Sequence, residues 1–380
     1  MRQFKTLAVS LGAAFLVAAC GGSDRVTFSS MVSFGDSLSD VGTYKVGTVA
    51  ALGGGLYTVN GISGAIGSSP TPSKNWTELI AAKLGQTAPC PAQTGLDGDA
   101  TQGFLVPVVN HSTCRNYAQG GARVTNPVGP GNKLLGGSNA ILGQLTVPIV
   151  TQISNHLGTV GGSFSGQELV TVAAGANDIF INLATIAPTI TFLMTPGGGG
   201  LDLQTATTTA SNAAVTAMGT AGAELAGYIK TQILGKGAKY VIVVNVPDVS
   251  KTPFAYSQDA STQGLINLMS TTFNTQLQTG LNGANVRIVD VYTDIRNQAA
   301  NPALYALTNV TTPACNLTAP APNALGSSLV CTVATTAAAS NVIAGDTSRY
   351  LFADSVHPSP YGYKLFADLV STEMSKAGWL

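Results

Sequence analysis

Met31-Val32-Ser33-Phe34-Gly35-Asp36-Ser37-Leu38, residues 31–38, opens the part of the sequence that decides the fold. A short apolar run leads directly into a glycine, a carboxylate and a serine, which is typical of a buried strand that ends in a turn before a helix. Similar short runs follow at 115–118, 169–174, 240–246 and 286–291. Longer helical patterns separate these runs. The alternation predicts an α/β fold, in which helices cover a parallel sheet of five strands.

Five helices are expected between and after these strands, at 75–84, 144–157, 205–234, 262–281 and 361–377. Asn75-Trp76-Thr77-Glu78 has the pattern of a capping box, and Gly85 follows the end of that first helix. Pro148 has to lie in the first turn of the second helix or kink it. Residues 42–72 and 301–350 indicate long loops with functional roles, and the glycine-rich stretch 196–200 indicates an exposed turn.

The composition fits one large domain. Hydrophobic residues make up 45% of the 380 residues, and 18 basic side chains balance 18 acidic ones. This balance gives no field that would gather nucleic acid or an anionic membrane. We therefore expect no nucleic-acid partner.

The first residues have the features of an export signal. Arg2 and Lys5 precede an apolar run at 7–19 that is too short to span a bilayer. The run ends in Ala18-Ala19-Cys20-Gly21-Gly22, which resembles the bacterial lipobox, in which the cysteine is lipidated. Ordinary cleavage beside a fortuitous cysteine is the alternative. The expected organisation is a lipoprotein signal peptide at 1–19, a linker at 20–28 and one large folded domain at 29–380.

Four cysteines remain after Cys20: Cys90, Cys114, Cys315 and Cys331. An even number in an exported chain favours two disulfides. Of the three possible connectivities we prefer Cys90–Cys114 and Cys315–Cys331, because each closes a local loop. A zinc site is disfavoured by the absence of CxxC spacing and of a nearby histidine.

Two segments at opposite ends of the chain supply the parts of an activated nucleophile. Ser37 follows the first strand directly, where its N–H can point at an anion. Asp354 lies three residues before His357, close enough in a turn to bond the ring N–H and fix its tautomer.

Two further segments offer hydrogen-bond donors at strand ends. They are Asn116-Tyr117-Ala118-Gln119-Gly120-Gly121 and Gly175-Ala176-Asn177-Asp178. A glycine lets a backbone N–H approach a ligand closely, and an asparagine amide donates without charge. The carboxyl ends of parallel strands are where open α/β sheets bind ligands.

Other polar and aromatic residues are interpreted as structural. Asp36, Asp40 and Asp178 are expected to support their turns, and His111 and His156 to be structural or exposed. The aromatic residues Tyr44, Tyr57, Trp76 and Tyr361 either line an acyl pocket or belong to the core.

The sequence resembles the GDSL or SGNH hydrolase family in four motifs and in their order: the Ser37 segment, residues 116–121, residues 175–178, and Asp354 with His357. The resemblance implies a flavodoxin-like three-layer sandwich with a five-stranded parallel sheet. It makes Ser37 the nucleophile, His357 its base and Asp354 the residue that orients the histidine. Asn177 and Gly121 become oxyanion donors, with Gly120 as the fallback for Gly121. The Gly-x-Ser-x-Gly elbow of the other large esterase fold is absent around Ser37.

The expected activity is hydrolysis of carboxylic esters through an acyl-enzyme, with no metal or cofactor. A phospholipase, an acyltransferase or a carbohydrate deacetylase with the same triad is the alternative, as is an inactive surface lipoprotein that binds a partner. The low charge and the lipid anchor favour lipid-like esters. Glycine at position 21, directly after Cys20, resembles the sequence of lipoproteins that are sent to the outer membrane. The alternative is a periplasmic or secreted protein.

Overall fold

A four-stranded parallel sheet forms the centre of the protein. The computed structural model describes residues 26–61, 73–318, 325–333 and 341–380. The strands are β1 (Met31–Gly35), β4 (Leu169–Ala173), β5 (Tyr240–Val244) and β6 (Arg287–Val289), in the order β1-β4-β5-β6. Met31 lies opposite Leu169, which in turn lies opposite Tyr240. All residues of β1 and β4 are buried, as expected for strands covered on both faces.

The fifth predicted strand, at 115–118, is not part of this sheet, and this prediction was wrong in its strand count. The segment runs beside β1, and Asn116 makes isolated bridges to Ser33 and to Pro91. The Asn116 side chain accepts the Ala118 N–H and donates to the Ser39 carbonyl. Because it bonds its own backbone, the segment turns into a loop instead of extending a ladder.

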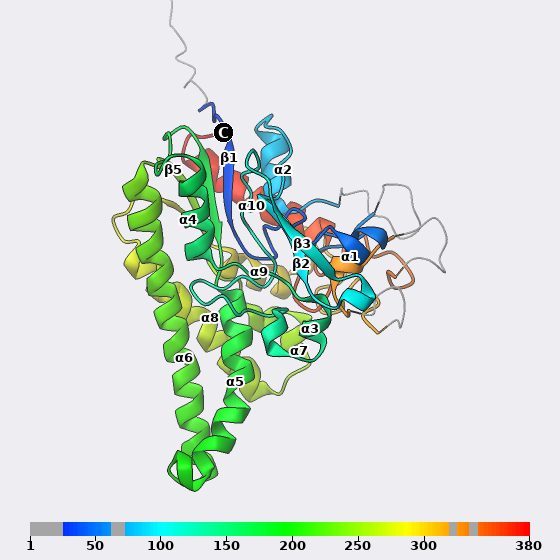
Figure 1. The fold of residues 1–380 in the computed structure, drawn as a ribbon, viewed down its shortest axis with the longest axis vertical. Coiled ribbons are helices and arrows are strands. Elements are labelled where there is room, and N and C mark those ends of the chain that lie inside the picture. The colour runs from blue at the N-terminus through cyan, green and yellow to red at the C-terminus, as the bar shows by residue number, and fades with distance from the viewer. Residues whose placement is uncertain (1–25, 62–72, 319–324, 334–340) are drawn as a thin grey trace, which may run out of the picture.

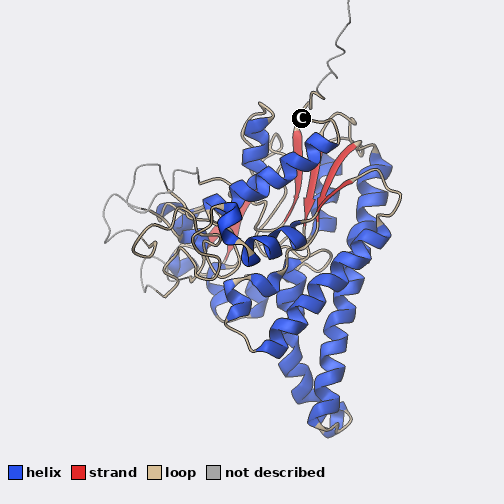
Figure 2. Ribbon diagram, turned by 180° about the vertical axis from the view of Figure 1, so that it is seen from behind, coloured by secondary structure: helices blue, strands red, loops and turns tan. Residues whose placement is uncertain are grey.

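The sheet lies between two groups of helices (Figure 2). Side chains along each strand point alternately to one group and to the other. Val170, Val172, Val241 and Val243 pack with α4 (Ile149–Thr159), α6 (Leu203–Tyr228) and α8 (Ala260–Gly280). Leu169, Ala173, Ile242 and Val244 pack with α2 (Trp76–Lys83) and α10 (Pro360–Lys376). The three layers of the predicted sandwich are therefore present.

The predicted helices are all found, with ends shifted by a few residues. The capping box is confirmed, because Asn75 accepts the Thr77 and Glu78 N–H groups while Glu78 accepts the Asn75 N–H. Pro148 is the N-cap of α4, so it precedes the helix and does not kink it. The third helix ends earlier than expected, since Ile229–Ile233 forms a π-helical turn.

Two helices at the carboxyl end of the sheet were not predicted. They are α5 (Ala176–Met194) and α9 (Val291–Ala300). Helix α5 is long and apolar enough to cross a membrane by length and composition alone, and 17% of it is buried. Helices α5 and α6 form a hairpin that projects away from the sheet (Figure 1).

The long loops gather beside the carboxyl end of β1. A small antiparallel sheet pairs β2 (Gln93–Asp97) with β3 (Leu105–Asn110). The described part of the chain also contains three short α-helices: α1 (Gly47–Ala51), α3 (Ser138–Leu142) and α7 (Pro253–Tyr256). The structure pairs Cys90 with Cys114 and Cys315 with Cys331, as expected. Cys20 lies outside the described residues.

Candidate active site

Ser37 lies in the turn that follows β1, and close packing fixes this turn. A Cβ on Gly35 would lie 2.8 Å from the Ala173 carbonyl oxygen, so only glycine fits between the strand and the turn. Asp36 Oδ1 accepts the Leu38 N–H at 3.0 Å. Burial raises the pKa of Asp36 to about 7. The carboxyl supports the turn, as the sequence predicted.

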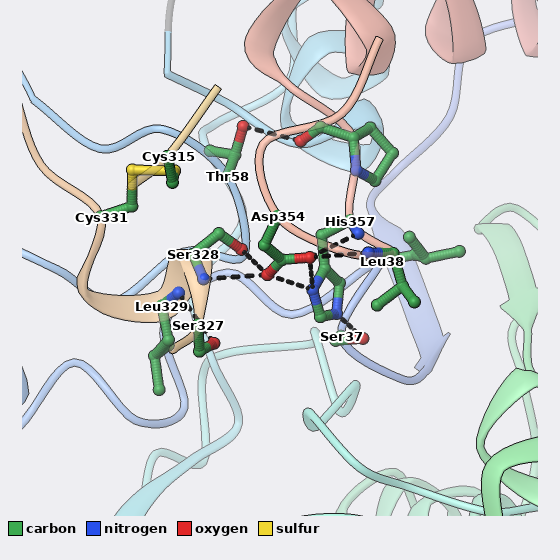
Figure 3. Close-up of polar contacts among 12 residues, drawn as sticks. Ser37, Leu38, Thr58, Cys315, Ser327, Ser328, Leu329, Cys331, Asp354 and His357 are labelled. Atoms are coloured by element: carbon green, nitrogen blue, oxygen red, sulfur yellow. Dashed lines mark hydrogen bonds and ion pairs between the residues drawn. A yellow bond between two sulfur atoms is a disulfide. The ribbon is translucent and has the colours of Figure 1, made fainter. Parts of the chain in front are cut away.

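Asp354 and His357 meet Ser37 from the other end of the chain (Figure 3). His357 Nε2 lies 2.7 Å from Ser37 Oγ, and His357 Nδ1 lies 2.7 Å from Asp354 Oδ2. Asp354 Oδ1 also accepts the N–H groups of Val356 and His357. The arrangement leaves Nε2 facing the serine hydroxyl, which is the geometry of a general base beside a nucleophile.

Ser328 braces the buried Asp354, and the sequence had not singled it out. Its N–H and its hydroxyl donate to Asp354 Oδ2 at 2.9 and 2.5 Å. Burial alone would raise the pKa of Asp354, but the charge and hydrogen bond of His357, with the Ser328 hydroxyl, hold it well below its usual range. The aspartate is therefore ionised throughout the ordinary pH range. Ser328 lies three residues before Cys331, in the loop that the second disulfide closes.

Two candidate donors face the same space as Ser37 Oγ. Gly121 and Asn177 line the cavity beside Ser37 and His357. The Gly120 N–H donates to Asp40 Oδ2, whereas the Gly121 N–H has no acceptor within the described part of the chain. Gly121 has a φ of +78°, the left-handed region that glycine adopts most easily. This arrangement favours Gly121 over Gly120.

Acidic side chains hold these donors in place. Asp40 accepts the N–H groups of Gly42, Thr43 and Gly120, and burial raises its pKa to about 6. Asp178 bonds Arg123 and the Val124 N–H. These contacts confirm that Asp40 and Asp178 support their turns.

A cavity of about 340 Å³ opens beside the serine. Most of the side chains that line it are apolar, including Leu38, Ile141, Leu142, Phe180, Val249, Ile295, Phe352 and Phe366. Helices α3, α5, α9 and α10 each contribute to this wall, and α3, α5 and α9 were not predicted. Asp294 also lines the cavity; burial raises its pKa to about 6, and it accepts a hydrogen bond from Gln298. The cavity fits an uncharged, largely apolar group.

Comparison with known proteins decides the family. Residues 31–370 match the family described as GDSL-like lipase/acylhydrolase. The chain belongs to this family. The family hydrolyses ester bonds, so this GDSL-like protein is a hydrolase of lipid or other ester substrates.

Two lipolytic enzymes are among the solved structures that this chain matches. An extracellular lipase from Streptomyces rimosus is 15% identical, with a TM-score of 0.41 over 90% of this chain and 99% of its own. A phospholipase A1 from Streptomyces albidoflavus is 12% identical, with a TM-score of 0.42 over 91% of this chain and 99% of its own. No curated protein matches the sequence.

Of the four aromatic residues considered for an acyl pocket, Tyr57 alone lines the cavity of this GDSL-like hydrolase. Its ring lies against the His357 ring, with centroids 4.7 Å apart. Tyr44, Trp76 and Tyr361 belong to the core clusters. Tyr57 thus limits how far the imidazole can tilt.

The other two histidines lie away from this cavity. His156 is buried among aromatic rings, and burial lowers its pKa to about 4. His111 Nε2 bonds Thr94 Oγ1 at 2.9 Å. Both are structural, as expected. Within the described ranges no three His, Cys, Asp or Glu side chains gather as a metal site.

Proposed function

We propose that this GDSL-like hydrolase cleaves carboxylic esters through an acyl-enzyme on Ser37. The observation that carries the proposal is the continuous hydrogen-bonded path from Ser37 Oγ through the His357 ring to Asp354. His357 Nε2 takes the hydroxyl proton as Oγ attacks the ester carbonyl, and returns it to the leaving alcohol. A water deprotonated by the same nitrogen then releases the acid and restores the serine. Asp354 keeps Nδ1 protonated and stabilises the imidazolium.

The negative oxygen of the tetrahedral intermediate would be held by three donors. These are the N–H groups of Ser37 and Gly121 and the side-chain amide of Asn177. The Ser37 and Gly121 N–H groups have no acceptor in the described part of the chain, and Asn177 has a second amide hydrogen besides the one it gives to the Ala122 carbonyl. Each such donor is typically worth about 3 kcal/mol in the transition state.

The apolar wall of the cavity supports an acyl chain as the group bound there. Burial of each methylene of such a chain contributes about 0.8 kcal/mol. An acetylated glycan would place many of its hydroxyl groups against the apolar side chains that make up most of the wall, and these cannot bond them. A lipid-like ester is therefore the better fit.

Hydrolysis of p-nitrophenyl esters from acetate to palmitate tests the function. We expect wild type to prefer acyl chains longer than acetate, and Ser37→Ala to lose activity by at least about a thousandfold. Ser39→Ala is the matched control. Ser39 lies in the same turn as Ser37, but its Oγ accepts the Trp76 ring N–H and takes no part in the proposed reaction. A folded wild type that cleaves none of these esters would shift the proposal to an acyltransferase.

We further propose that the chain is exported and anchored through a lipid on Cys20, with the outer membrane as its destination. The two disulfides support export, because such bonds persist in oxidising compartments. Labelled palmitate should be incorporated into wild type and not into Cys20→Ser. Incorporation that survives this change would refute the anchor.

A further inference from the structure

The hairpin of α5 and α6 extends beyond the body of the hydrolase, and its outer end is not used by the chemistry described above. Figure 1 shows α5 starting at the carboxyl end of the sheet and α6 running alongside the sheet, and the two helices meet at a turn far from it. We call residues 190–203 the hairpin tip. Residues 192, 194 and 203 of the tip do not line the cavity beside Ser37.

The hairpin carries almost no charge. From residue 179 to residue 223 the only charged side chain is Asp202, whereas 9% of the whole chain is charged. The carboxylate of Asp202 is itself engaged, since it caps α6 by accepting the N–H and hydroxyl of Thr205. An exposed helix pair in water ordinarily carries charges on its outer face.

The threonine hydroxyls of α5 are satisfied inside the helix. Thr185, Thr189, Thr191 and Thr195 each donate to a backbone carbonyl three or four residues earlier. These hydroxyls therefore need no water as acceptor. A helix surface with its donors already satisfied enters an apolar medium at much lower cost than one that needs water.

Large apolar side chains are exposed at the tip. Phe192 is 59% exposed, Met194 45% and Leu203 60%. The turn between them, at 196–200, is one proline followed by four glycines. About half of the surface of each of these three side chains is left uncovered by the described part of the chain, and each would gain from leaving water.

We propose that the hairpin tip docks into the surface of an uncharged phospholipid layer. Phe192, Met194 and Leu203 enter the layer at the level of the upper acyl chains, as apolar side chains of interfacial helices do. Because the tip holds no cation, the docking does not depend on anionic lipid or on salt. Asp178 and Asn177 at the base of α5 stay in the body, bonded to Arg123 and Ala122, so the helix does not cross the layer.

A second copy of the chain is the other conceivable partner, and the tip fits it less well. A stable protein interface buries about 800 Å² on each side with complementary side chains. Four successive glycines contribute almost no side-chain surface to such an interface. A lipid layer requires no complementary shape.

Docking at the tip would set the position of the active site over the lipid. Phe180 of α5 lines the catalytic cavity, and Met194 lies 14 residues further along the same helix. At 1.5 Å per residue the tip lies about 20 Å from the cavity along the helix axis. Docking itself does not require Ser37, whereas its use in lipolysis rests on the proposed function.

Vesicle binding tests the docking. The processed chain from residue 20 is prepared with Cys20→Ser, so that it bears no lipid anchor, and with Ser37→Ala, so that it degrades no lipid. The chain is sedimented with phosphatidylcholine vesicles at low and high salt. The tip variant is Phe192→Ser/Met194→Ser/Leu203→Ser. The matched control is Val109→Ser/Leu268→Ser/Leu304→Ser, whose three side chains are 49%, 50% and 83% exposed elsewhere on the molecule.

We expect the tip variant to bind vesicles at least about tenfold more weakly, and the control to bind like the unmodified chain at both salt concentrations. With Ser37 restored, the tip variant should cleave a soluble short-chain ester at the wild-type rate and vesicle lipid more slowly.

Equal binding by the tip variant, or no binding by any form, would overturn the proposal. If the unaltered chain formed a dimer in solution, and the tip variant did not dimerise but still bound vesicles equally well, the tip would be assigned to contact with a second copy. If the chain with Ser37 restored and an unaltered tip did not cleave the soluble ester, the proposed function would be refuted and the docking result would stand.

Discussion

Asn177 approaches Ser37 from the first turn of α5 and Gly121 approaches it from a loop, and hydrogen bonds outside the cavity fix both positions. Asn177 Nδ2 donates to the Ala122 carbonyl at 2.9 Å, so one amide links the loop of Gly121 to the start of α5. Asp178 holds the same loop through Arg123 and Val124. The two donors therefore keep their spacing when no ester is bound, which is the condition for strong stabilisation of an oxyanion.

Removal of the Asn177 amide should slow the reaction without unfolding the protein. We expect Asn177→Ala to lower kcat by about a hundredfold or more, because one of three oxyanion donors is lost. Steady-state kinetics on a soluble p-nitrophenyl ester measures the effect. Asn182→Ala is the control, since Asn182 lies in the same helix and donates to the Asp178 carbonyl outside the cavity. Full activity in Asn177→Ala would remove this residue from the mechanism.

Asp36 should make the protein less stable as the pH rises. Its pKa in the folded protein is about 7 because of burial, against 3.8 in the unfolded chain. Between about pH 4 and pH 7 the folded state holds a proton that the unfolded state has lost, so the free energy of unfolding falls with increasing pH. Asp36→Asn keeps an acceptor for the Leu38 N–H and abolishes this loss.

Thermal unfolding across this pH range tests the role of Asp36. We expect the Tm of Asp36→Asn to match wild type near pH 4 and to exceed it increasingly up to about pH 8. Asp99→Asn changes an exposed carboxylate and should show no such divergence. Parallel curves for wild type and Asp36→Asn would contradict the raised pKa.

At the scale of elements, α4 holds the end of β1 through a single buried side chain. Gln152 Oε1 accepts the Gly35 N–H at 2.9 Å, and its Nε2 donates to the carbonyls of Gly35 and Val147 at 2.8 Å. Gly35 begins the turn that carries Ser37. The amide therefore connects the packing of a helix to the position of Ser37.

Gln152→Leu keeps the volume and removes these hydrogen bonds. We expect it to lower the free energy of unfolding by about 1–3 kcal/mol, because backbone groups of Gly35 and Val147 lose a partner while buried. Chemical denaturation measures the loss, and kcat should fall with it. Ser154→Ala, an exposed change in the same helix, should leave both quantities unchanged. An unaltered denaturation midpoint in Gln152→Leu would show that the amide is replaceable.

The sequence predicted the elements whose signals are local and missed those that depend on tertiary contacts. The capping box at Asn75 and the apolar runs of β1, β4 and β5 are local signals, and they are confirmed. Helix α5 was missed because β-branched residues and Pro188 make its sequence resemble an extended segment. The predicted strand at 115–118 failed because the Asn116 side chain takes over backbone partners.

The candidate site shows the same division. Ser37, Asp354, His357 and Asn177 lie in short motifs that a single sequence displays. The choice of Gly121 over Gly120 as oxyanion donor does not follow from the sequence. It depends on the hydrogen bond in which Asp40 accepts the Gly120 N–H. Ser328 carries no sequence signal at all, because its role depends on a tertiary contact with Asp354, which lies 26 positions later in the sequence.

At the scale of the whole molecule, the two disulfides have different relations to the site. They join residues 24 and 16 positions apart, so each should stabilise the fold by about 3 kcal/mol. Cys90–Cys114 lies beside the small antiparallel sheet. Cys315–Cys331 closes the segment that presents Ser328 to Asp354.

Paired cysteine replacements should separate stability from activity. We expect Cys90→Ser/Cys114→Ser and Cys315→Ser/Cys331→Ser to lower Tm by similar amounts. The second pair alone should also reduce kcat several-fold at a temperature where both variants are folded, because Asp354 loses a fixed brace. Circular dichroism and ester kinetics measure the two effects. Equal kcat values in the two variants would show that Ser328 is held without its disulfide.

The contact between Ser328 and Asp354, with the Cys315–Cys331 disulfide behind it, also bears on when the chain reaches its full activity. A newly synthesised chain in a reducing compartment has free thiols at Cys315 and Cys331. No disulfide then closes the segment that carries Ser328, so we expect this reduced chain to hydrolyse esters several-fold more slowly. Oxidation of the two thiols should therefore stabilise the fold and raise the rate of ester cleavage in a single step.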